Sequence, residues 1–200
     1  ERYLRHFHNR GAVTLVPPQT LAHRLAGAGF RNLMVIARGV DTELFKPARR
    51  SDELRRSWGA NESTLVVATV GRIAPEKNLD LAVFAFEAMR RARPDARMVF
   101  VGDGPQKSAL ATRHPEHVFA GMRHGADLAA HYASADIFLL PSLTETFGNV
   151  TLEALASGLG IVAYDSAAAG ALVDDGIDGL LAPPGDEHGF IDAAVALAAD

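Results

Sequence analysis

The sequence predicts an α/β protein built on a doubly wound parallel sheet, and two patterns carry that prediction. Short apolar segments such as 64–70 and 137–140 are rich in β-branched or bulky residues and too brief for core helices, which is typical of strands buried on both faces. Helical segments separate these runs, and that alternation favours parallel strands joined by right-handed crossovers. The expected domain is therefore Rossmann-like, with ligands bound beyond the carboxyl ends of its strands.

Each element follows from an apolar pattern and the residues that end it. Strand 64–70 ends at Gly71, and the Ala-rich helix 79–93 has Asn78 as its expected N-cap and Pro94 as its stop. The other elements are assigned in the same way. In full, the predicted strands are 12–16, 33–36, 64–70, 97–101, 118–120, 137–140, 161–164 and 179–181, and the predicted helices are 20–28, 79–93, 106–112, 127–133, 149–157 and 186–200.

Composition excludes several classes of function. The 200 residues are 48% hydrophobic and include no cysteine, so disulfides, thiolate metal sites and cysteine nucleophiles are ruled out. A net charge of −4 does not indicate a basic surface of the kind that binds nucleic acid. No apolar run approaches the roughly 20 residues of a transmembrane segment. The eight histidines show neither an HExxH motif nor paired ligand spacing, so we expect no metal site.

The first 40 residues differ from the rest of the chain. A turn-rich stretch at 38–47 follows them, and the charged segment 49–56 is predicted to be a solvated linker or the start of a helix. We expect residues 1–40 to be the remnant of a preceding domain and its linker. Residues 41–200 are then the ligand-binding domain, cut short within its last helix.

A first cluster of candidate functional residues follows strand 64–70. Gly71 lets the backbone approach a ligand closely, and Arg72 and Lys77 flank the loop in front of a helix N-terminus. Two cations beside free backbone N–H groups favour an anion, most naturally a phosphate. The alternative is that both side chains simply pair on the surface with Glu76 or Asp80.

A second cluster follows strand 137–140. Glu145 lies in the loop, Glu153 lies about one turn into the next helix, and the N–H groups of 148–151 face the same crevice. Two carboxylates can accept hydrogen bonds from two polyols, while the helix N-terminus between them faces a phosphate. The alternative is a loop charge and a helix acid that complements the macrodipole. Nearby, 102–105 resembles the start of a dinucleotide fingerprint, but Lys107 stands where its third glycine belongs.

Taken in order, these segments resemble the C-terminal, donor-binding half of a retaining GT-B-fold glycosyltransferase of the group 1, family four type. The resemblance covers residues 38–190 and rests on RGVDTELFKP, VGRIAPEKNLDLAVFAF, PDARMVFVGDGP, HYASADIFLLPSLTETFGNVTLEALASG and GLLAPPGD. The segment 142–145 is similar to a mannosyltransferase-like or sulfolipid-synthase-like subgroup.

The resemblance implies a transfer of a hexose from a nucleotide-diphosphate sugar, with retention at the anomeric carbon. By position, Arg72 and Lys77 match the pair that clamps the donor pyrophosphate. Glu145 matches the first acid of a Glu–seven residues–Glu motif, which contacts the transferred sugar, and Glu153 matches the second, which holds the ribose. The resemblance assigns the catalytic roles to Arg72, Lys77 and Glu145.

Further donor-binding positions come from the same resemblance. Thr151 matches a phosphate-contacting position, and Gly121 with Met122 matches the segment that borders the nucleobase. The segment whose backbone amides contact the sugar and phosphate is matched by Phe147, Gly148, Asn149 and Val150. Gly71 is the last of the predicted donor-binding residues.

The implied partners are a UDP- or GDP-sugar donor and an unidentified sugar or lipid acceptor, held mainly by an N-terminal domain that the chain lacks. No cofactor and no metal are expected, because the cationic pair can replace a metal. The isolated fragment is expected to be inactive and cytoplasmic, and peripheral attachment of the full-length protein to the inner membrane stays open. Two alternatives remain at this stage, a GT-B-fold nucleotide-sugar epimerase and a non-catalytic nucleotide-sugar-binding module.

Overall fold

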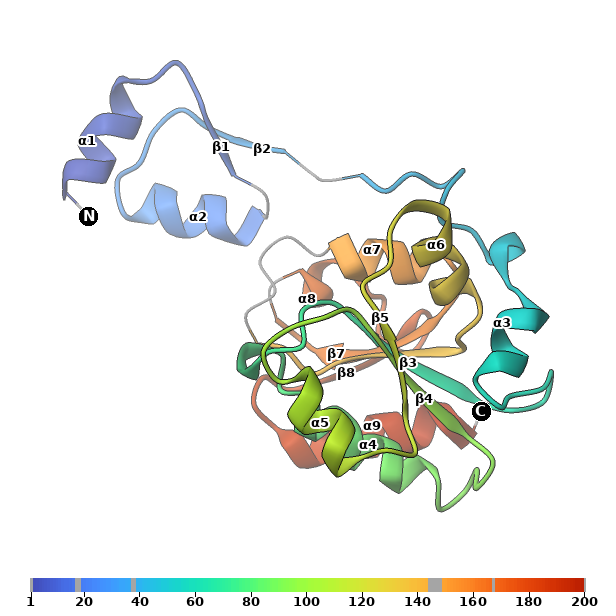
Figure 1. Cartoon of the computed structure of the whole chain (residues 1–200). Helices are drawn as coiled ribbons and strands as arrows, with labels where there is room; N and C mark the ends of the chain where they lie inside the picture. Colours follow the sequence, from blue (N-terminus) through green and yellow to red (C-terminus); the bar gives the residue numbers. More distant parts are fainter. Residues whose placement is uncertain (1, 17–18, 37–38, 144–148, 167, 200) are drawn as a thin grey trace.

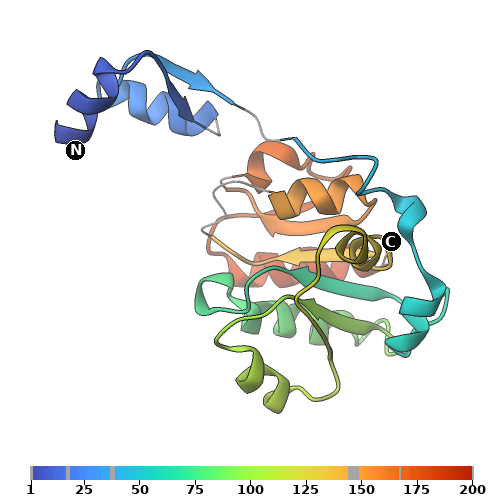
Figure 2. The same ribbon diagram turned by 45° about the horizontal axis from the view of Figure 1, so that its top comes forward.

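A computed structural model describes residues 2–16, 19–36, 39–143, 149–166 and 168–199 (Figure 1). A small N-terminal unit stands away from a larger sheet-based unit, to which an extended segment joins it (Figures 1 and 2). Among the described residues, the two apolar cores of the larger unit draw on no residue before Val40. No helix in these ranges has the length and apolarity that crossing a membrane requires.

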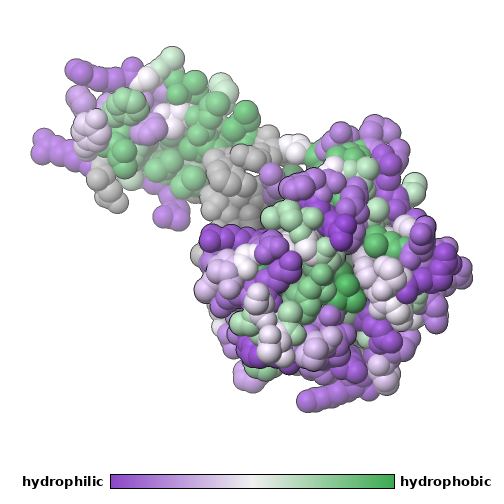
Figure 3. Space-filling model, in the orientation of Figure 1, coloured by the Kyte–Doolittle hydropathy of each residue, from purple (hydrophilic) through white to green (hydrophobic). Residues whose placement is uncertain are grey.

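The N-terminal unit pairs two short parallel strands with two helices. Strands β1 and β2 align Thr14 with Leu33, as the predicted strands 12–16 and 33–36 anticipate. In the space-filling view apolar residues gather on part of its surface beside polar ones, and Tyr3, Phe7 and Met34 are exposed (Figure 3). A helix at the very start was not predicted. The elements are α1 (Arg2–Arg10), β1 (Thr14–Val16), α2 (Gln19–Gly27) and β2 (Leu33–Val35).

The larger unit is built on a parallel sheet, which confirms the predicted fold class. Its strand order is β5-β4-β3-β6-β7-β8, and every neighbouring pair runs parallel. Continuous burial of β3 and β6 explains their unbroken apolar sequences, since both faces are covered. The strands are β3 (Val66–Val70), β4 (Arg97–Val101), β5 (Val118–Gly121), β6 (Ile137–Leu140), β7 (Gly160–Tyr164) and β8 (Gly179–Ala182).

Helices cover both faces of this sheet (Figure 2). Successive side chains of a strand point to opposite faces of the sheet, so each face has its own core. Val67 and Leu139 belong to the core shared with α4, α5 and α9. Val66 and Leu140 belong to the core shared with α6, α7 and α8. The helices are α4 (Leu79–Met89), α5 (Lys107–Arg113), α6 (Gly125–Ala133), α7 (Asn149–Ala156), α8 (Ala169–Leu172) and α9 (Glu187–Ala199).

The strand order reverses between β3 and β6, and this reversal positions the site. The chain leaves β3 toward β4 on one side and leaves β6 toward β7 on the other, so the loops after the two strands diverge. Such a switch point opens a crevice at the carboxyl ends of the strands. Across it, the Ser142 hydroxyl donates to the Glu76 carbonyl oxygen at 3.3 Å and ties the two loops together.

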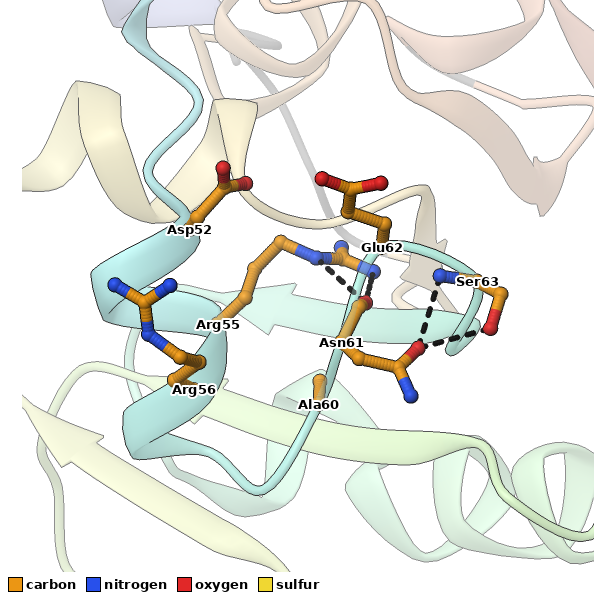
Figure 4. A pocket seen from close by; sticks show the side chains of 7 residues that line it. All are labelled: Asp52, Arg55, Arg56, Ala60, Asn61, Glu62 and Ser63. Atoms are coloured by element: carbon orange, nitrogen blue, oxygen red, sulfur yellow. Dashed lines mark hydrogen bonds between the residues drawn. The ribbon is translucent and has the colours of Figure 1, made fainter.

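Segment 49–56 contains the start of a helix, the second of the two predicted alternatives. A 3₁₀ turn (Pro47–Arg49) precedes helix α3 (Asp52–Ser57), and the Ser51 side chain caps this helix by accepting from the Leu54 N–H at 3.2 Å. Arg55 on α3 is buried, with 1% of its side chain exposed. Its guanidinium donates to the carbonyl oxygen of Asn61 at 2.8 Å (Figure 4). It also donates to the carbonyl oxygen of Ser134 at 2.7 Å.

The expected cap at Asn78 differs in detail. Asn78 precedes α4 as expected, but its φ of 48° is left-handed and its side chain caps no N–H group. A second 3₁₀ turn, Pro75–Lys77, comes directly before it. The chain therefore enters α4 through a tight turn, and this turn brings Lys77 near the end of β3.

Candidate donor-binding groove

A groove of about 610 Å³ lies at the carboxyl edge of the sheet, on the β4–β5 side of the switch point. It is assembled from the ends of β3 and β4, the segment after β5, and the starts of α6 and α7. Residues far apart in the sequence thus meet at one surface. Its lining consists of Val70, Gly71, Arg72, Val101, Gly102, Asp103, Gly104, Met122, Arg123, His124, Leu128, Val150 and Glu153.

Gly71 brings the backbone to the groove, as predicted. Its φ is 141°, a conformation that favours glycine, and a Cβ built there would meet no atom within 4 Å. Gly102 next to it is required for a different reason. A Cβ on Gly102 would lie 1.9 Å from the Gly71 carbonyl oxygen, so the loops after β3 and β4 can approach only through glycine.

Arg72 lines the groove with 66% of its side chain exposed, and its Nη1 lies 3.2 Å from the Glu76 Oε1. Arg72 therefore forms the surface ion pair with Glu76 that was the alternative to phosphate binding. Asp80 instead pairs with Arg113 at 2.7 Å. Exposed pairs contribute about 0–1 kcal/mol, so a phosphate can compete with Glu76 for the guanidinium.

Lys77 lies in an adjoining hollow rather than in the groove itself. That hollow shares Gly71 and Arg72 with the groove and reaches across the switch point to Leu139 and Pro141. The two predicted cations and Gly71 therefore line one hollow at the end of β3.

Glu153 brings a carboxylate to the same groove from α7. The Tyr132 hydroxyl, on the buried Tyr132 side chain of α6, donates to Glu153 Oε2 at 3.0 Å. Burial raises the pKa of the Glu153 carboxyl above its usual value, and the hydrogen bond from Tyr132 opposes that effect. Tyr132 leaves the other carboxylate oxygen of Glu153 able to accept from a ligand hydroxyl.

The remaining predicted residues separate into three groups. Met122 and Val150 line the groove, and Gly121 ends β5 with a φ of 76°. Asn149 is exposed at the start of α7, whereas Thr151 is fully buried. The Thr151 hydroxyl has no hydrogen-bond partner within the described ranges and does not line the groove, so any contact to phosphate would come from its backbone. Glu145, Phe147 and Gly148 lie outside the described residues.

Eight lining residues were not among the predicted site residues: Val70, Val101, Gly102, Asp103, Gly104, Arg123, His124 and Leu128. Most of them lie at or shortly after the ends of β4 and β5, where an open parallel sheet binds its ligands. The Arg123 guanidinium donates to the Ala120 carbonyl oxygen at 2.7 and 2.9 Å, which fixes it at the rim. The Lys107 ammonium, hydrogen-bonded to Asp103 at 2.9 Å, lowers the pKa of that carboxyl.

A second hollow, at the opposite edge of the sheet, has a structural explanation. It is lined by residues of α3 and the following loop, among them Arg55, Asn61 and Ser63 (Figure 4). The Arg55 guanidinium and the Asn61 side chain are held there by hydrogen bonds within the protein. They connect α3 to the starts of β3 and β6 and are not directed at a ligand.

The sequence of the chain matches a known protein family and several known proteins. The family model for glycosyl transferases group 1 matches residues 64–200. A GDP-mannose-dependent alpha-mannosyltransferase from Mycobacterium tuberculosis is 39% identical over 197 residues, which is 98% of this chain and 50% of the relative. The Arabidopsis thaliana sulfoquinovosyl transferase SQD2 is 40% identical over 92% of this chain and 37% of its own length. The chain thus spans about half the length of the curated relatives it matches.

Solved structures agree with the fold. Anabaena HepE in complex with UDP superposes with a TM-score of 0.77 at 25% identity, over 99% of this chain and 62% of its own. A sucrose-phosphate synthase from Thermosynechococcus elongatus gives a TM-score of 0.82 at 22% identity, over 100% of this chain and 52% of its own, and this likeness concerns the fold alone.

Proposed function

The chain belongs to the group 1 glycosyltransferase family, and from that premise we propose that its groove binds the donor of a hexose transfer, a nucleoside diphosphate sugar. GDP-mannose is the first candidate. Several relatives at 35–41% identity are named GDP-mannose-dependent alpha-mannosyltransferases. A UDP-sugar is the second candidate, since HepE was solved with UDP and UDP-glucose. The relatives' names favour a transferase over an epimerase or a non-catalytic module.

The observation that carries this proposal is that Arg72 and Glu153 line the same groove, together with Gly71 and Val150. A guanidinium is suited to a phosphate, and a carboxylate accepts from the vicinal hydroxyls of a ribose. The groove volume of about 610 Å³ falls within the range typical of small-molecule sites. Its apolar lining, including Met122 and Leu128, offers a surface for a nucleobase.

Arg72 and Lys77 would act on the departing diphosphate. As the bond between the anomeric carbon and the diphosphate oxygen breaks, negative charge develops on that oxygen. Two cations placed beside it stabilise the transition state more than the ground state. Arg72 would exchange its contact with Glu76 for the phosphate. With these charges in place, we propose that donor binding requires no metal ion.

We propose retention at the anomeric carbon by substitution from the front face. The acceptor hydroxyl forms the new C–O bond on the face that the diphosphate leaves, and its proton passes to the departing phosphate oxygen. Glu145 is assigned to the transferred sugar by its match to the family motif. Retention is tested on the full-length protein by NMR of the product. An α-linked product from the α-configured donor supports it, and a β-linked product contradicts it.

This chain supplies the donor side of the proposed enzyme. We propose that residues 1–40 belong to a preceding domain and its linker, that 41–200 are the donor domain, and that the acceptor binds mainly to the preceding domain. The length of the mycobacterial relative supports the proposal, because this chain covers 50% of it. The 200-residue chain should therefore bind donor without transferring sugar.

Calorimetric titration with GDP, UDP and ADP tests the proposed donor site. We expect saturable binding of GDP with a 1:1 stoichiometry, unchanged by EDTA. The double substitution Arg72→Ala and Lys77→Ala should weaken it about 100-fold or more, since charge-assisted hydrogen bonds contribute about 1.5–3 kcal/mol each. Arg91→Ala is the matched control, because Arg91 is exposed just beyond the far end of α4. Equal affinity in the double variant and the control would contradict the proposed clamp.

A further inference from the structure

The turn between α5 and β5 gathers groups that bind metals, at the opposite end of β5 from the groove. Residues 114–117 read His-Pro-Glu-His, and the His117 N–H donates to the His114 carbonyl oxygen at 3.2 Å to close the turn. This turn brings two imidazoles and one carboxylate to the same side. The sequence predicted no metal site, because its histidines show neither an HExxH motif nor paired ligand spacing. In the structure the side chains of His114, Glu116 and His117 lie close enough to share one ion.

The three candidate ligand atoms are already close together. Glu116 Oε1 lies 3.7 Å from His114 Nδ1 and 3.7 Å from His117 Nε2, and all three atoms lie within 4.8 Å of one another. Bonds of about 2.0–2.1 Å in a tetrahedral zinc site place neighbouring ligand atoms roughly 3.3 Å apart. Small movements of the Glu116 and His114 side chains, 48% and 25% exposed, close that difference.

His117 supplies independent evidence that a ligand belongs here. Its side chain is 2% exposed, yet within the described parts of the chain its buried Nε2 has no hydrogen-bond partner. A buried nitrogen without a partner is costly, and a bound cation would satisfy it. Phe86 of α4 and Phe100 of β4 pack against the ring at 5.3 and 6.0 Å between centroids, which holds it in place.

The charges around the turn are compatible with a cation. The Glu116 carboxylate supplies a negative charge beside the two imidazoles. Arg90 is the nearby competing cation, and its guanidinium is paired with Glu87 at 3.3 Å.

We propose that His114, Glu116 and His117 form a binding site for one Zn²⁺ ion. Two imidazole nitrogens and one carboxylate are a ligand set that zinc prefers over magnesium or calcium, and the fourth position faces solvent on the Glu116 side. The ion would fix the turn that begins the edge strand β5. This site is separate from the donor groove and does not depend on the proposed sugar transfer.

Calorimetric titration of the untagged 200-residue chain with ZnSO₄ tests the site, with MgCl₂ as the comparison ion. We expect one zinc ion per chain, no saturable magnesium binding, and visible ligand-field absorption of a four-coordinate complex when Co²⁺ replaces Zn²⁺. His114→Gln and Glu116→Gln should each weaken zinc binding about tenfold or more, because both ligands lie on the surface side of the turn and can be replaced without disturbing the core.

His188→Gln is the matched control, since His188 is an exposed histidine flanked by acidic residues on α9. Zinc affinity in this control should stay within about twofold of the parent chain. The absence of saturable zinc binding would overturn the proposal. Equal losses in His188→Gln and in the two turn variants would overturn it as well, because they would indicate general surface binding.

Discussion

The Arg55 guanidinium lies inside the protein, in a charged segment that was predicted to be a solvated linker or the start of a helix. Its acceptors are the carbonyl oxygens of Asn61, Thr64 and Ser134 and the carboxylate of Asp136. Asp136 in turn accepts from the Val66 N–H at 2.8 Å at the start of β3. These partners are up to 81 positions away in the sequence, so no local pattern could have identified a buried arginine.

Replacing Arg55 should destabilise the protein. Arg55→Ala removes one partner of a mostly buried ion pair and leaves carbonyl oxygens without donors, so we expect a loss of about 3 kcal/mol in the free energy of unfolding, measured in urea. Arg56→Ala is the control, because Arg56 is the exposed neighbour on the same helix. Similar midpoints for the two variants would contradict a structural role for Arg55.

The buried carboxyl of Glu153 should make the stability of the fold depend on pH. A carboxyl whose folded-state pKa is raised stabilises the fold below its unfolded pKa, and that contribution is lost as pH rises through the folded pKa. Glu153→Gln removes the buried charge at high pH and keeps an acceptor for Tyr132. The Tm of this variant relative to the parent chain should therefore be more favourable at pH 8 than at pH 4.

The control for this pH dependence is Glu62→Gln, because Glu62 is exposed. Its Tm difference from the parent chain should be nearly the same at both pH values. A Glu153→Gln difference that does not change with pH would contradict the buried-charge account. GDP affinity should fall in Glu153→Gln, because a neutral amide accepts less strongly than a carboxylate from ribose hydroxyls.

At the scale of elements, the sheet was predictable because its strands are continuously apolar. Segments 97–101 and 137–140 were predicted with the bounds that the structure shows for β4 and β6. Two helices were missed. Helix α1 was missed although Tyr3, Leu4 and Phe7 recur at a helical spacing, and α8 spans only Ala169–Leu172. The predicted helix 79–93 runs past the end of α4 at Met89, and the predicted helix 186–200 starts one residue before α9, because propensity alone does not define helix ends.

The candidate site was predictable only in part, because a groove is formed by loops from several strands. Gly71, Arg72, Met122, Val150 and Glu153 were expected and lie together. Asp103 was not chosen although segment 102–105 was noted for its resemblance to a dinucleotide fingerprint, and Arg123 was not chosen because only the sheet order brings it to the same edge. The pairing of Arg72 with Glu76 depends on side-chain geometry that residue spacing leaves open.

The close approach of the loops after β3 and β4 gives a prediction at the element scale. Gly102→Ala places a Cβ against the Gly71 carbonyl oxygen at a φ of 139°, so both clash and backbone strain oppose it. We expect a loss of about 3 kcal/mol in the free energy of unfolding. Gly176→Ala, at a φ of 79° with open space around it, isolates the strain alone and should cost about 1 kcal/mol. Equal costs would contradict the proposed contact.

At the scale of the whole molecule, the two apolar cores begin at Val40 and the N-terminal unit packs on itself. Deleting residues 1–38 should therefore leave the Tm within a few degrees of the parent chain and the GDP affinity within about twofold. Thermal unfolding and calorimetry measure the two effects. A truncated chain that fails to unfold cooperatively would show that the N-terminal unit contributes to the fold of the larger one.

The central claim is that the groove at the switch point holds the donor nucleotide, and amide NMR during a GDP titration tests it most directly. The account predicts saturable shifts concentrated at Gly71, Arg72, Met122, Val150 and Glu153, the residues that meet at the carboxyl edge of the sheet. Shifts centred instead on residues 52–63, around the hollow at the opposite edge, would contradict it. So would a titration in which no amide moves.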